Sequence, residues 1–244
     1  MQNNLVYGIH AVQAVLERTP QTIKQLWVQQ GRLDKKLVSL VSVAREAQLS
    51  IQSVSLKTLN NMVNANHQGI IIECITNKNN FTEGDIFLLL KQQDSPLFLV
   101  LDGIEDPHNL GACLRSADAA GVAAVIAPKD KAAGITPVVR KVACGAVETV
   151  PFIQVTNLVR TLQQLQQAGV WLFGAVGEVK QTLYDCDLRG AIAIVMGREG
   201  KGLRRLTRET CDHLMRIPMF GSVESLNVSV ATGICLFEAS RQRH

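Results

Sequence analysis

The sequence predicts an α/β protein whose C-terminal part contains a mostly parallel sheet covered by helices. Short apolar runs typical of buried strands alternate with helical patterns from Pro96 onward. A smaller α/β alternation occupies the first 76 residues. A stretch rich in asparagine, lysine and glutamine separates the two parts. We therefore expect a small domain over residues 1–76, an interdomain linker over 77–95 and a larger domain over 96–244.

Composition narrows the class of protein without naming a partner. The chain has 244 residues, 47% of them hydrophobic, which is enough for a substantial core. Its net charge of +4 is compatible with RNA binding but not diagnostic of it. The six cysteines are widely spaced and form no C-x-x-C pair, so we expect buried thiols and no metal site. No leader-like start and no apolar run near the roughly 20 residues of a membrane span occur, so we expect a cytoplasmic protein.

The N-terminal 76 residues predict a compact α/β unit. We expect helices over Ile9–Glu17 and Lys35–Ala47, and strands over Gln25–Val28, near Ile51 and over Ile70–Cys74. Basic side chains that can meet phosphates, although a solvated face is their ordinary state, are Arg32, Lys35, Lys36, Arg45 and Lys57. His10 and His67 each lie close to a glycine, and we expect structural or RNA-contacting roles for them rather than catalytic ones.

The apolar island Ile86–Leu90 predicts a short helix within the linker. In the larger domain, strands are expected near Phe98, Ala124, Phe152, Val170 and Ile192. Helices are expected near Ser116, Val139, Leu162 and Leu206. Ligands bind such sheets at the carboxyl ends of the strands. Four loops fall there, those that contain Asn109, Gly174–Gly177, Gly197–Gly202 and Ile217–Asn227. Three stretches of the sequence place polar residues at these ends.

The first stretch is Leu97–Gly121, in which an apolar strand runs into a polar turn and a helix of small residues. Asn109 and Arg115 flank the start of this helix. A guanidinium on a helix made for close packing needs an anionic partner, and helical spacing also allows an ion pair between Arg115 and Asp118.

The second stretch follows the apolar strand Ala191–Met196 with the loop GREGKG. Three glycines in six residues predict a tight loop, but their order is neither that of a dinucleotide-binding loop nor that of a Walker loop. Glu199 lies in this loop, where a solvated carboxylate is the more frequent case.

The third stretch, Ile217–Glu238, predicts a strand end, a glycine loop and a helix. Ser225 or Asn227 can cap this helix. The helix begins at Val228, and its recurring apolar residues, which predict a buried face, are Val228, Ala231, Ile234, Cys235 and Phe237.

Together the three stretches resemble the signature motifs of the SPOUT methyltransferases, in the TrmH-like subgroup of RNA ribose 2′-O-methyltransferases. The motifs are Asn109 with Arg115 six positions on, the loop GREGKGL, and IPMFGSVESLNVSVATG. The resemblance runs from YGIHAVQAVLE through HQGIIIE to the last helix. It implies a C-terminal SPOUT domain with a deep trefoil knot, an L30e-like RNA substrate-binding domain before it, and a homodimer. It also implies S-adenosyl-L-methionine as cofactor and a guanosine of 23S rRNA as substrate.

The resemblance also implies roles for individual residues. The expected catalytic residues are Asn109, Arg115, Glu199, Ser225 and Asn227, and the expected cofactor-binding residues are Gly197, Ile217 and Leu226. We expect the guanidinium of Arg115 to bind the phosphate beside the target ribose and to stabilise the developing oxyanion, while a role as base stays open.

Three other functions stay open at this point. The first is ribose methylation of tRNA by an enzyme of the same family. The second is a non-catalytic RNA-binding or ribosome-assembly protein on the same fold, which the presence of Asn109, Arg115 and Glu199 disfavours. The third is a nucleotide-dependent oxidoreductase, which the order of the glycines disfavours.

Overall fold

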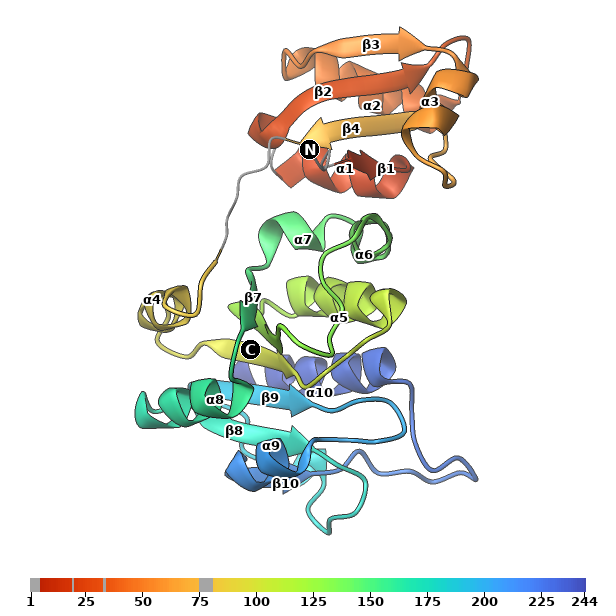
Figure 1. The fold of residues 1–244 in the computed structure, drawn as a ribbon. Coiled ribbons are helices and arrows are strands. Elements are labelled where there is room, and N and C mark those ends of the chain that lie inside the picture. Colours follow the sequence, from red (N-terminus) through yellow and green to blue (C-terminus); the bar gives the residue numbers. More distant parts are fainter. Residues whose placement is uncertain (1–4, 19, 33, 75–80) are drawn as a thin grey trace. The chain divides into compact units, whose positions relative to one another are not determined.

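The computed structural model describes residues 5–18, 20–32, 34–74 and 81–244, and the chain divides into two compact units. The N-terminal unit comprises Met1–Asn79 and Ile135–Thr149, and the C-terminal unit comprises Asn80–Gly134 and Val150–His244. Figure 1 shows their elements. Residues 77–80, the first part of the expected linker, lie outside the described residues.

The N-terminal unit is a four-stranded sheet with helices on both faces. Its strands are β1 (Leu5–Tyr7), β2 (Ile23–Gln29), β3 (Ile51–Val54) and β4 (Ile70–Cys74). Its helices are α1 (Ile9–Arg18), η1 (Pro20–Thr22), α2 (Lys35–Glu46), α3 (Leu56–Met62), α6 (Pro137–Ala143) and α7 (Ala146–Thr149). The strand order is β1-β4-β2-β3, with β4 antiparallel to both neighbours and β2 parallel to β3.

The core of this unit confirms the elements expected from its sequence. The apolar faces of α1 and α2 pack with Leu26 and Ile72 on one side of the sheet, and Leu59 of α3 packs with Ile71 on the other. The sequence analysis did not identify β1 or α3. Strand β1 spans only three residues, which is too short for an alternating pattern to be recognised.

The C-terminal unit contains a six-stranded sheet. Its strands are β5 (Leu97–Leu101), β6 (Ala124–Pro128), β7 (Phe152–Val155), β8 (Trp171–Ala175), β9 (Ile192–Met196) and β10 (His213–Met215). Its helices are α4 (Asp85–Lys91), α5 (Pro107–Ala119), α8 (Leu158–Gln167), η2 (Leu183–Asp185), α9 (Arg205–Thr210) and α10 (Val228–Arg243). The expected strands near Phe98, Ala124, Phe152, Val170 and Ile192 are therefore confirmed.

All five strand pairings of this sheet are parallel, and the order is β10-β8-β9-β5-β6-β7. The chain runs from β5 outward to β7, crosses to β8 on the other side of β5, and later places β9 between β8 and β5. The order of the strands therefore reverses between β5 and β9. In open parallel sheets this switch point is where ligands bind, outside the carboxyl ends of the strands.

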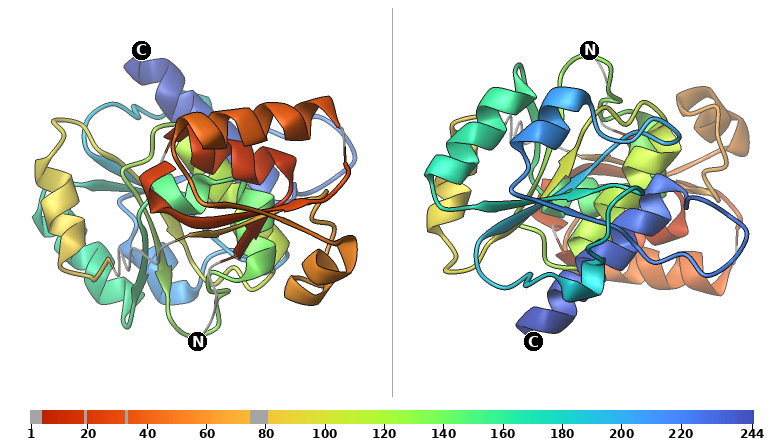
Figure 2. Two further views of the ribbon diagram at one scale, coloured as in Figure 1. Left: turned by 90° about the horizontal axis from the view of Figure 1, so that it is seen from above. Right: turned by 90° about the horizontal axis from the view of Figure 1, so that it is seen from below.

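Helices cover both faces of the six-stranded sheet (Figures 1 and 2). On one face α4 and α8 bury Ile86, Leu162 and Leu165 against Phe98 and Val195. The short helix expected in the linker is thus α4, which packs into the core of the C-terminal unit. On the other face α5 and α10 lie side by side, and the thiol of Cys113 donates to Thr232 Oγ1 at 3.5 Å.

Two details of the last stretch differ from expectation. The strand expected to close at Ile217 and Pro218 ends earlier, at Met215. Of the two expected caps, Ser225 and Asn227, it is Asn227 that caps the helix, and α10 begins at Val228. The prediction that Phe237 is buried was wrong, because 52% of its side chain is exposed, while Leu236 next to it is fully buried.

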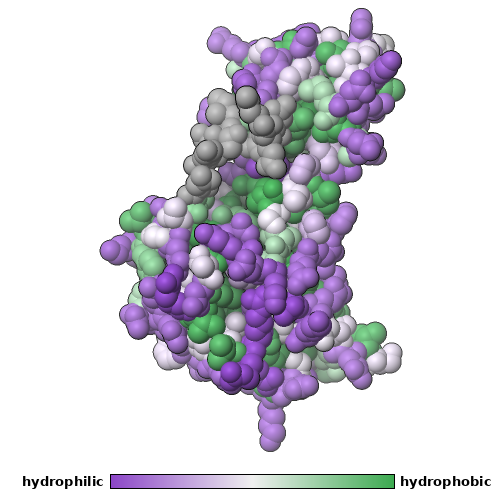
Figure 3. All heavy atoms as spheres, in the orientation of Figure 1, coloured by the Kyte–Doolittle hydropathy of each residue, from purple (hydrophilic) through white to green (hydrophobic). Residues whose placement is uncertain are grey.

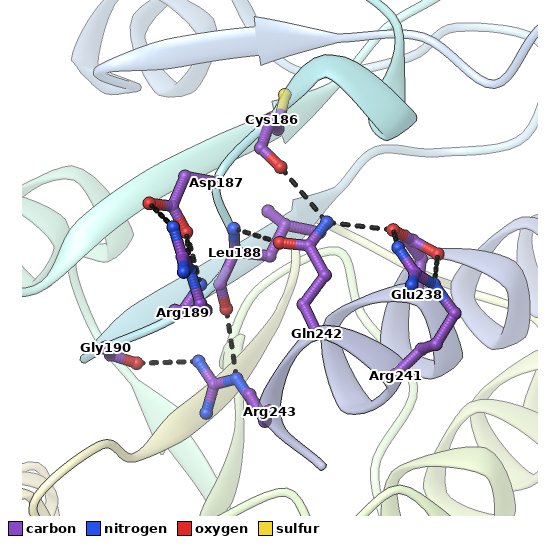
Figure 4. A network of polar contacts seen from close by, with 9 residues as sticks. All are labelled: Cys186, Asp187, Leu188, Arg189, Gly190, Glu238, Arg241, Gln242 and Arg243. Carbon is purple, nitrogen blue, oxygen red and sulfur yellow. Dashed lines mark hydrogen bonds and ion pairs between the residues drawn. The ribbon is translucent and has the colours of Figure 1, made fainter.

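The carboxyl end of α10 is attached to the loop before β9 (Figure 4). Arg243 donates to the carbonyl oxygens of Leu188, Gly190 and Ser95 at 3.0, 2.7 and 2.8 Å. Gln242 accepts from the backbone N–H of Leu188 and donates to the carbonyl oxygen of Cys186. We call these contacts the C-terminal clasp.

Hydrophilic residues cover most of the surface drawn in Figure 3, with hydrophobic residues in scattered spots. Among the described helices, none has the length and apolar character needed to cross a membrane. All six cysteines are free thiols, and four of them are buried, as expected. The exceptions, Cys144 and Cys211, are half-buried.

Candidate functional site

The switch point of the parallel sheet contains a hollow of about 230 Å³. The loop after β5 contributes residues from Gly103 to Asp106, and the loop after β9 contributes Arg198, Glu199 and Lys201. Asn109, in the first turn of α5, and Val228, at the start of α10, complete the lining. The hollow therefore lies where the fold predicts a ligand site.

Three of the five expected catalytic residues form one hydrogen-bonded chain at this hollow. The Nδ2 of Asn109 donates to Glu199 Oε2 at 3.2 Å, and the Nδ2 of Asn227 donates to Asn109 Oδ1 at 3.0 Å. The Oδ1 of Asn227 accepts the backbone N–H of Ser229 at 2.9 Å, which caps α10. One residue from each sequence motif thus takes part in a single polar arrangement.

Arg115 and Ser225 do not join this chain. Arg115 lies six positions after Asn109, about 240° around the helix, so it projects from another side of α5. It is exposed, and its guanidinium forms no hydrogen bond or ion pair with any described residue. Ser225 is exposed in the loop before α10 and likewise makes no hydrogen bond to the described part of the chain.

The loop after β9 is held tightly by its own backbone. The backbone N–H of Arg198 donates to the carbonyl of Gly202 at 3.0 Å, and the N–H of Gly202 donates back at 2.8 Å. A Cβ atom at Gly197 would lie 2.2 Å from the carbonyl carbon of Gly202. Glycine at position 197 is therefore required by the close approach of the loop to itself. This close approach places Glu199 at the hollow.

The segment 217–226 has the chemistry expected of a cofactor site. Ile217 and Leu226 are half-buried, and no backbone group of the segment forms a hydrogen bond with the described residues. Backbone donors and acceptors next to partly buried apolar side chains suit the edge and faces of an adenine ring. The residues present therefore fit a cofactor that carries an adenosyl group.

The sequence analysis missed an ion pair between a buried carboxylate and a half-buried guanidinium. Asp102 is fully buried, accepts the backbone N–H of Arg204 at 2.9 Å and lies 3.3 Å from that residue's guanidinium. Three buried atoms have no hydrogen-bond partner among the described residues: Asp102 Oδ1, Arg198 Nε and Arg204 Nη2. The signal in the sequence was an aspartate directly after the wholly apolar strand Leu97–Leu101.

The sequence of both units matches that of a known class of RNA-modifying enzymes. Residues 96–237 match the SpoU rRNA methylase family, and residues 5–79 match the substrate-binding domain of RNA 2′-O-ribose methyltransferases. The chain belongs to the SpoU rRNA methylase family. This finding confirms the resemblance to RNA ribose 2′-O-methyltransferases.

Relatives and solved structures agree with this membership. The 23S rRNA (guanosine-2′-O-)-methyltransferases RlmB of Vibrio cholerae and Pseudomonas putida are 56% and 52% identical to the chain. The first match spans 100% of this chain and 98% of the relative, and the second spans 98% and 96%. A crystal structure of an RNA 2′-O-ribose methyltransferase covers 98% of this chain and 88% of its own, with a TM-score of 0.78 and 28% identity. The methyltransferase AviRb of Streptomyces viridochromogenes, crystallised with AdoMet, shares the fold at a TM-score of 0.76 and 22% identity, over 98% of this chain and 89% of its own.

Proposed function

We propose that the protein transfers a methyl group from S-adenosyl-L-methionine to the ribose 2′-hydroxyl of one guanosine in 23S rRNA. Relatives that carry this activity in their names match the whole length of the chain. The observation that carries the proposal is the hydrogen-bonded chain of Glu199, Asn109 and Asn227 at the switch point of the sheet. A cytoplasmic location accords with such a substrate.

The segment around Ile217 and Leu226, together with Gly197, holds the cofactor in this proposal. S-adenosyl-L-methionine supplies an activated methyl group on a sulfonium, so no covalent enzyme intermediate is needed. The free backbone groups of 217–226 bind the adenine edge, and the side chains of Ile217 and Leu226 contact its faces.

Arg115 binds the phosphate beside the target ribose and stabilises the negative charge that develops on the 2′-oxygen. A guanidinium stays charged at neutral pH, and the exposed Arg115 has no described partner that would neutralise it. Asn109 fixes the orientation of Glu199, whose carboxylate accepts hydrogen bonds from the substrate or the arginine. Ser225 and Asn227 shape the corner in which the two reactants meet.

A homodimer completes the proposal, because Arg115 projects away from Asn109 within one chain. The side chains of Val230, Ile234 and Phe237 recur along one side of α10. Val230 and Phe237 are 51% and 52% exposed, as expected of a helix side that a second copy covers. Sedimentation of the wild type and of Phe237→Glu tests this arrangement. We expect a dimer for the wild type and a monomer for the variant, and a monomeric wild type contradicts it.

Transfer of labelled methyl groups into protein-free 23S rRNA and, separately, bulk tRNA tests the reaction. A labelled, alkali-resistant dinucleotide that contains 2′-O-methylguanosine is the expected product from 23S rRNA. Label in tRNA alone would show that tRNA is the substrate and that the proposed methyl transfer is correct. Absence of label despite cofactor binding contradicts the activity on free RNA. Arg115→Ala should lower kcat severely, and unchanged turnover in this variant contradicts the role assigned to Arg115.

A further inference from the structure

A second hollow, of about 250 Å³, lies in the N-terminal unit and takes no part in the site described above. Its walls come from the end of β2, from α3 and from the loop before β4. The polar side chains that line it are Gln29, Arg32, Asn60, Asn66, His67 and Gln68. None of the described residues that line it carries a carboxylate. We call it the His67 pocket.

His67 organises the base of this pocket. Its ring is only 5% exposed, and its Nδ1 accepts the backbone N–H of Gly69 at 3.0 Å. The ring proton must therefore lie on Nε2, which donates to Asn60 Oδ1 at 2.9 Å. This hydrogen bond fixes the amide of Asn60, whose Nδ2 has no hydrogen-bond partner among the described residues. A buried neutral histidine thus holds an amide donor at the pocket.

The rim is held by backbone of unusual geometry. Gln68 and Gly69 both have positive φ, 53° and 82°, and the first value is strained for a residue other than glycine. The Oε1 of Gln68 accepts the backbone N–H of Ile9 at 2.9 Å, which secures the strained turn. A Cβ atom at Gly69 would lie 3.1 Å from the guanidinium of Arg32, so glycine there lets Arg32 lie against the rim. Local strain that the surroundings maintain is typical of binding sites.

The chemistry of the lining selects a ligand class. Side-chain amides offer donors and acceptors together and can pair with the edge of a nucleobase. A guanidinium binds phosphate, and Arg32 is only weakly engaged by Asp34, at 3.5 Å. Leu56 is 49% exposed beside these groups and offers an apolar contact to the face of a base. Proteins recognise RNA sequence mainly through unpaired bases that can enter such sites.

We propose that the His67 pocket binds one unpaired nucleotide of the substrate RNA, other than the nucleotide that is methylated. The amides of Asn60 and Asn66 contact the base, and Arg32 contacts its phosphate. The inference rests on the proposed function, since it places a second contact on the same RNA. Residues 5–79 as a whole match a substrate-binding domain, and the proposal names the His67 pocket as one RNA contact within it.

The test is the affinity of the full-length protein for protein-free 23S rRNA at a series of KCl concentrations. Arg32→Ala and Asn66→Ala are compared with two matched controls, Lys24→Ala and Gln21→Ala, whose exposed side chains lie at the opposite end of β2. Arg32→Ala should weaken binding about tenfold and lower the slope of log K against log salt by about one, because a phosphate contact is lost. Asn66→Ala should weaken binding about tenfold at an unchanged slope, because a base contact is lost. The controls should stay within about twofold of the wild type.

Unchanged affinity in both pocket variants, with the wild-type thermal unfolding of the N-terminal unit, overturns the inference. The same titrations are run with bulk tRNA, so that the pocket is tested on whichever RNA the wild type methylates. If the wild type methylates 23S rRNA and the pocket variants bind this RNA normally, the role of the pocket is refuted and the proposed function stands. If the wild type methylates neither RNA, both the proposed function and the proposed role of the pocket are refuted.

Discussion

Asn109 connects the polar side chains of the candidate site, because its amide donates to Glu199 and accepts from Asn227. In Asn109→Asp the amide group that donates to Glu199 is replaced by a carboxylate oxygen, so this hydrogen bond is lost. The oxygen that accepts from Asn227 is kept. We expect kcat/KM to fall about 10- to 100-fold, the cost of one hydrogen bond to a charged group. Steady-state methyl transfer measures the loss.

The matched control for Asn109→Asp is its combination with Glu199→Gln. In this double variant the glutamine can donate to the new carboxylate, so the hydrogen bond returns with its roles exchanged. We expect the double variant to be more active than Asn109→Asp alone. Losses that simply add would show that the two residues do not act together.

The residues of the candidate site differ in how far sequence could predict them. Asn109, Glu199 and Asn227 were found because their motifs resemble those of the TrmH-like methyltransferases, and their loops fall at the edge of the sheet where the carboxyl ends of parallel strands meet. Asp102 and Arg204 were missed, because an ion pair between residues 102 positions apart leaves no local pattern. Phe237 was misplaced, because the buried side of a helix depends on what packs against it as well as on its own periodicity.

At the scale of elements, the conformation of the loop after β9 requires that residue 197 has no side chain. Gly197→Ala places a Cβ atom 2.2 Å from the backbone of Gly202, so the loop must move. We expect the affinity for S-adenosyl-L-methionine to fall about tenfold or more, as measured by calorimetry. Gly84→Ala is the control, since the nearest atom to the added Cβ would lie 3.7 Å away, an ordinary contact, and it should bind normally. Normal binding by Gly197→Ala would show that this loop does not hold the cofactor.

The C-terminal clasp gives a second prediction for an element. Arg243→Ala removes three hydrogen bonds from a charged donor to backbone carbonyls, and we expect the C-terminal unit to lose about 2 kcal/mol of unfolding free energy. Arg205 of α9 forms a pair with Glu209, and their side chains are 76% and 55% exposed. Arg205→Ala should therefore cost less than about 1 kcal/mol. Urea unfolding followed by the fluorescence of Trp171 measures both, and equal losses would contradict a special role for Arg243.

The apolar strands that recur at βα spacing were predicted, whereas the three-residue strands were not. The strands from β5 to β9 are wholly or mostly apolar and follow one another at βα spacing, so their existence and parallel pairing followed from the sequence. Strands β1 and β10 span three residues each and depend on neighbours that the sequence does not reveal. The trefoil knot and the domain boundaries 1–76, 77–95 and 96–244 stay predictions.

At the scale of the whole molecule, the two units should respond differently to acid. Burial, and then the charge of Arg32, lowers the pKa of His67 below its usual 6.5. The folded N-terminal unit therefore binds fewer protons than the unfolded chain, and it should lose stability as the pH falls below about 6.5. In the C-terminal unit, hydrogen bonds from Arg241 and Gln242 lower the pKa of Glu238 from 4.5 to about 2. The stability that this carboxylate contributes is lost only as the pH falls from 4.5 towards 2.

The two tryptophans allow this difference to be measured, because Trp27 lies in the N-terminal unit and Trp171 in the C-terminal unit. Urea unfolding of Trp171→Phe reports Trp27, and that of Trp27→Phe reports Trp171. Between pH 7.5 and pH 5 the midpoint of the Trp27 signal should fall more than that of the Trp171 signal. His67→Gln should remove this dependence, and a persistent dependence would assign it to another group.

The position of β9 in the sheet has a consequence for how the protein is made. Strand β9 separates β5 from β8 in the folded sheet, so until residues 192–196 leave the ribosome nothing can join β8 to β5, β6 and β7. The nascent chain thus carries two open parallel strand edges until its last quarter is synthesised, which favours dependence on chaperones. The polar chain of the site includes Asn227 as well, so it can form only when nearly all of the protein has emerged.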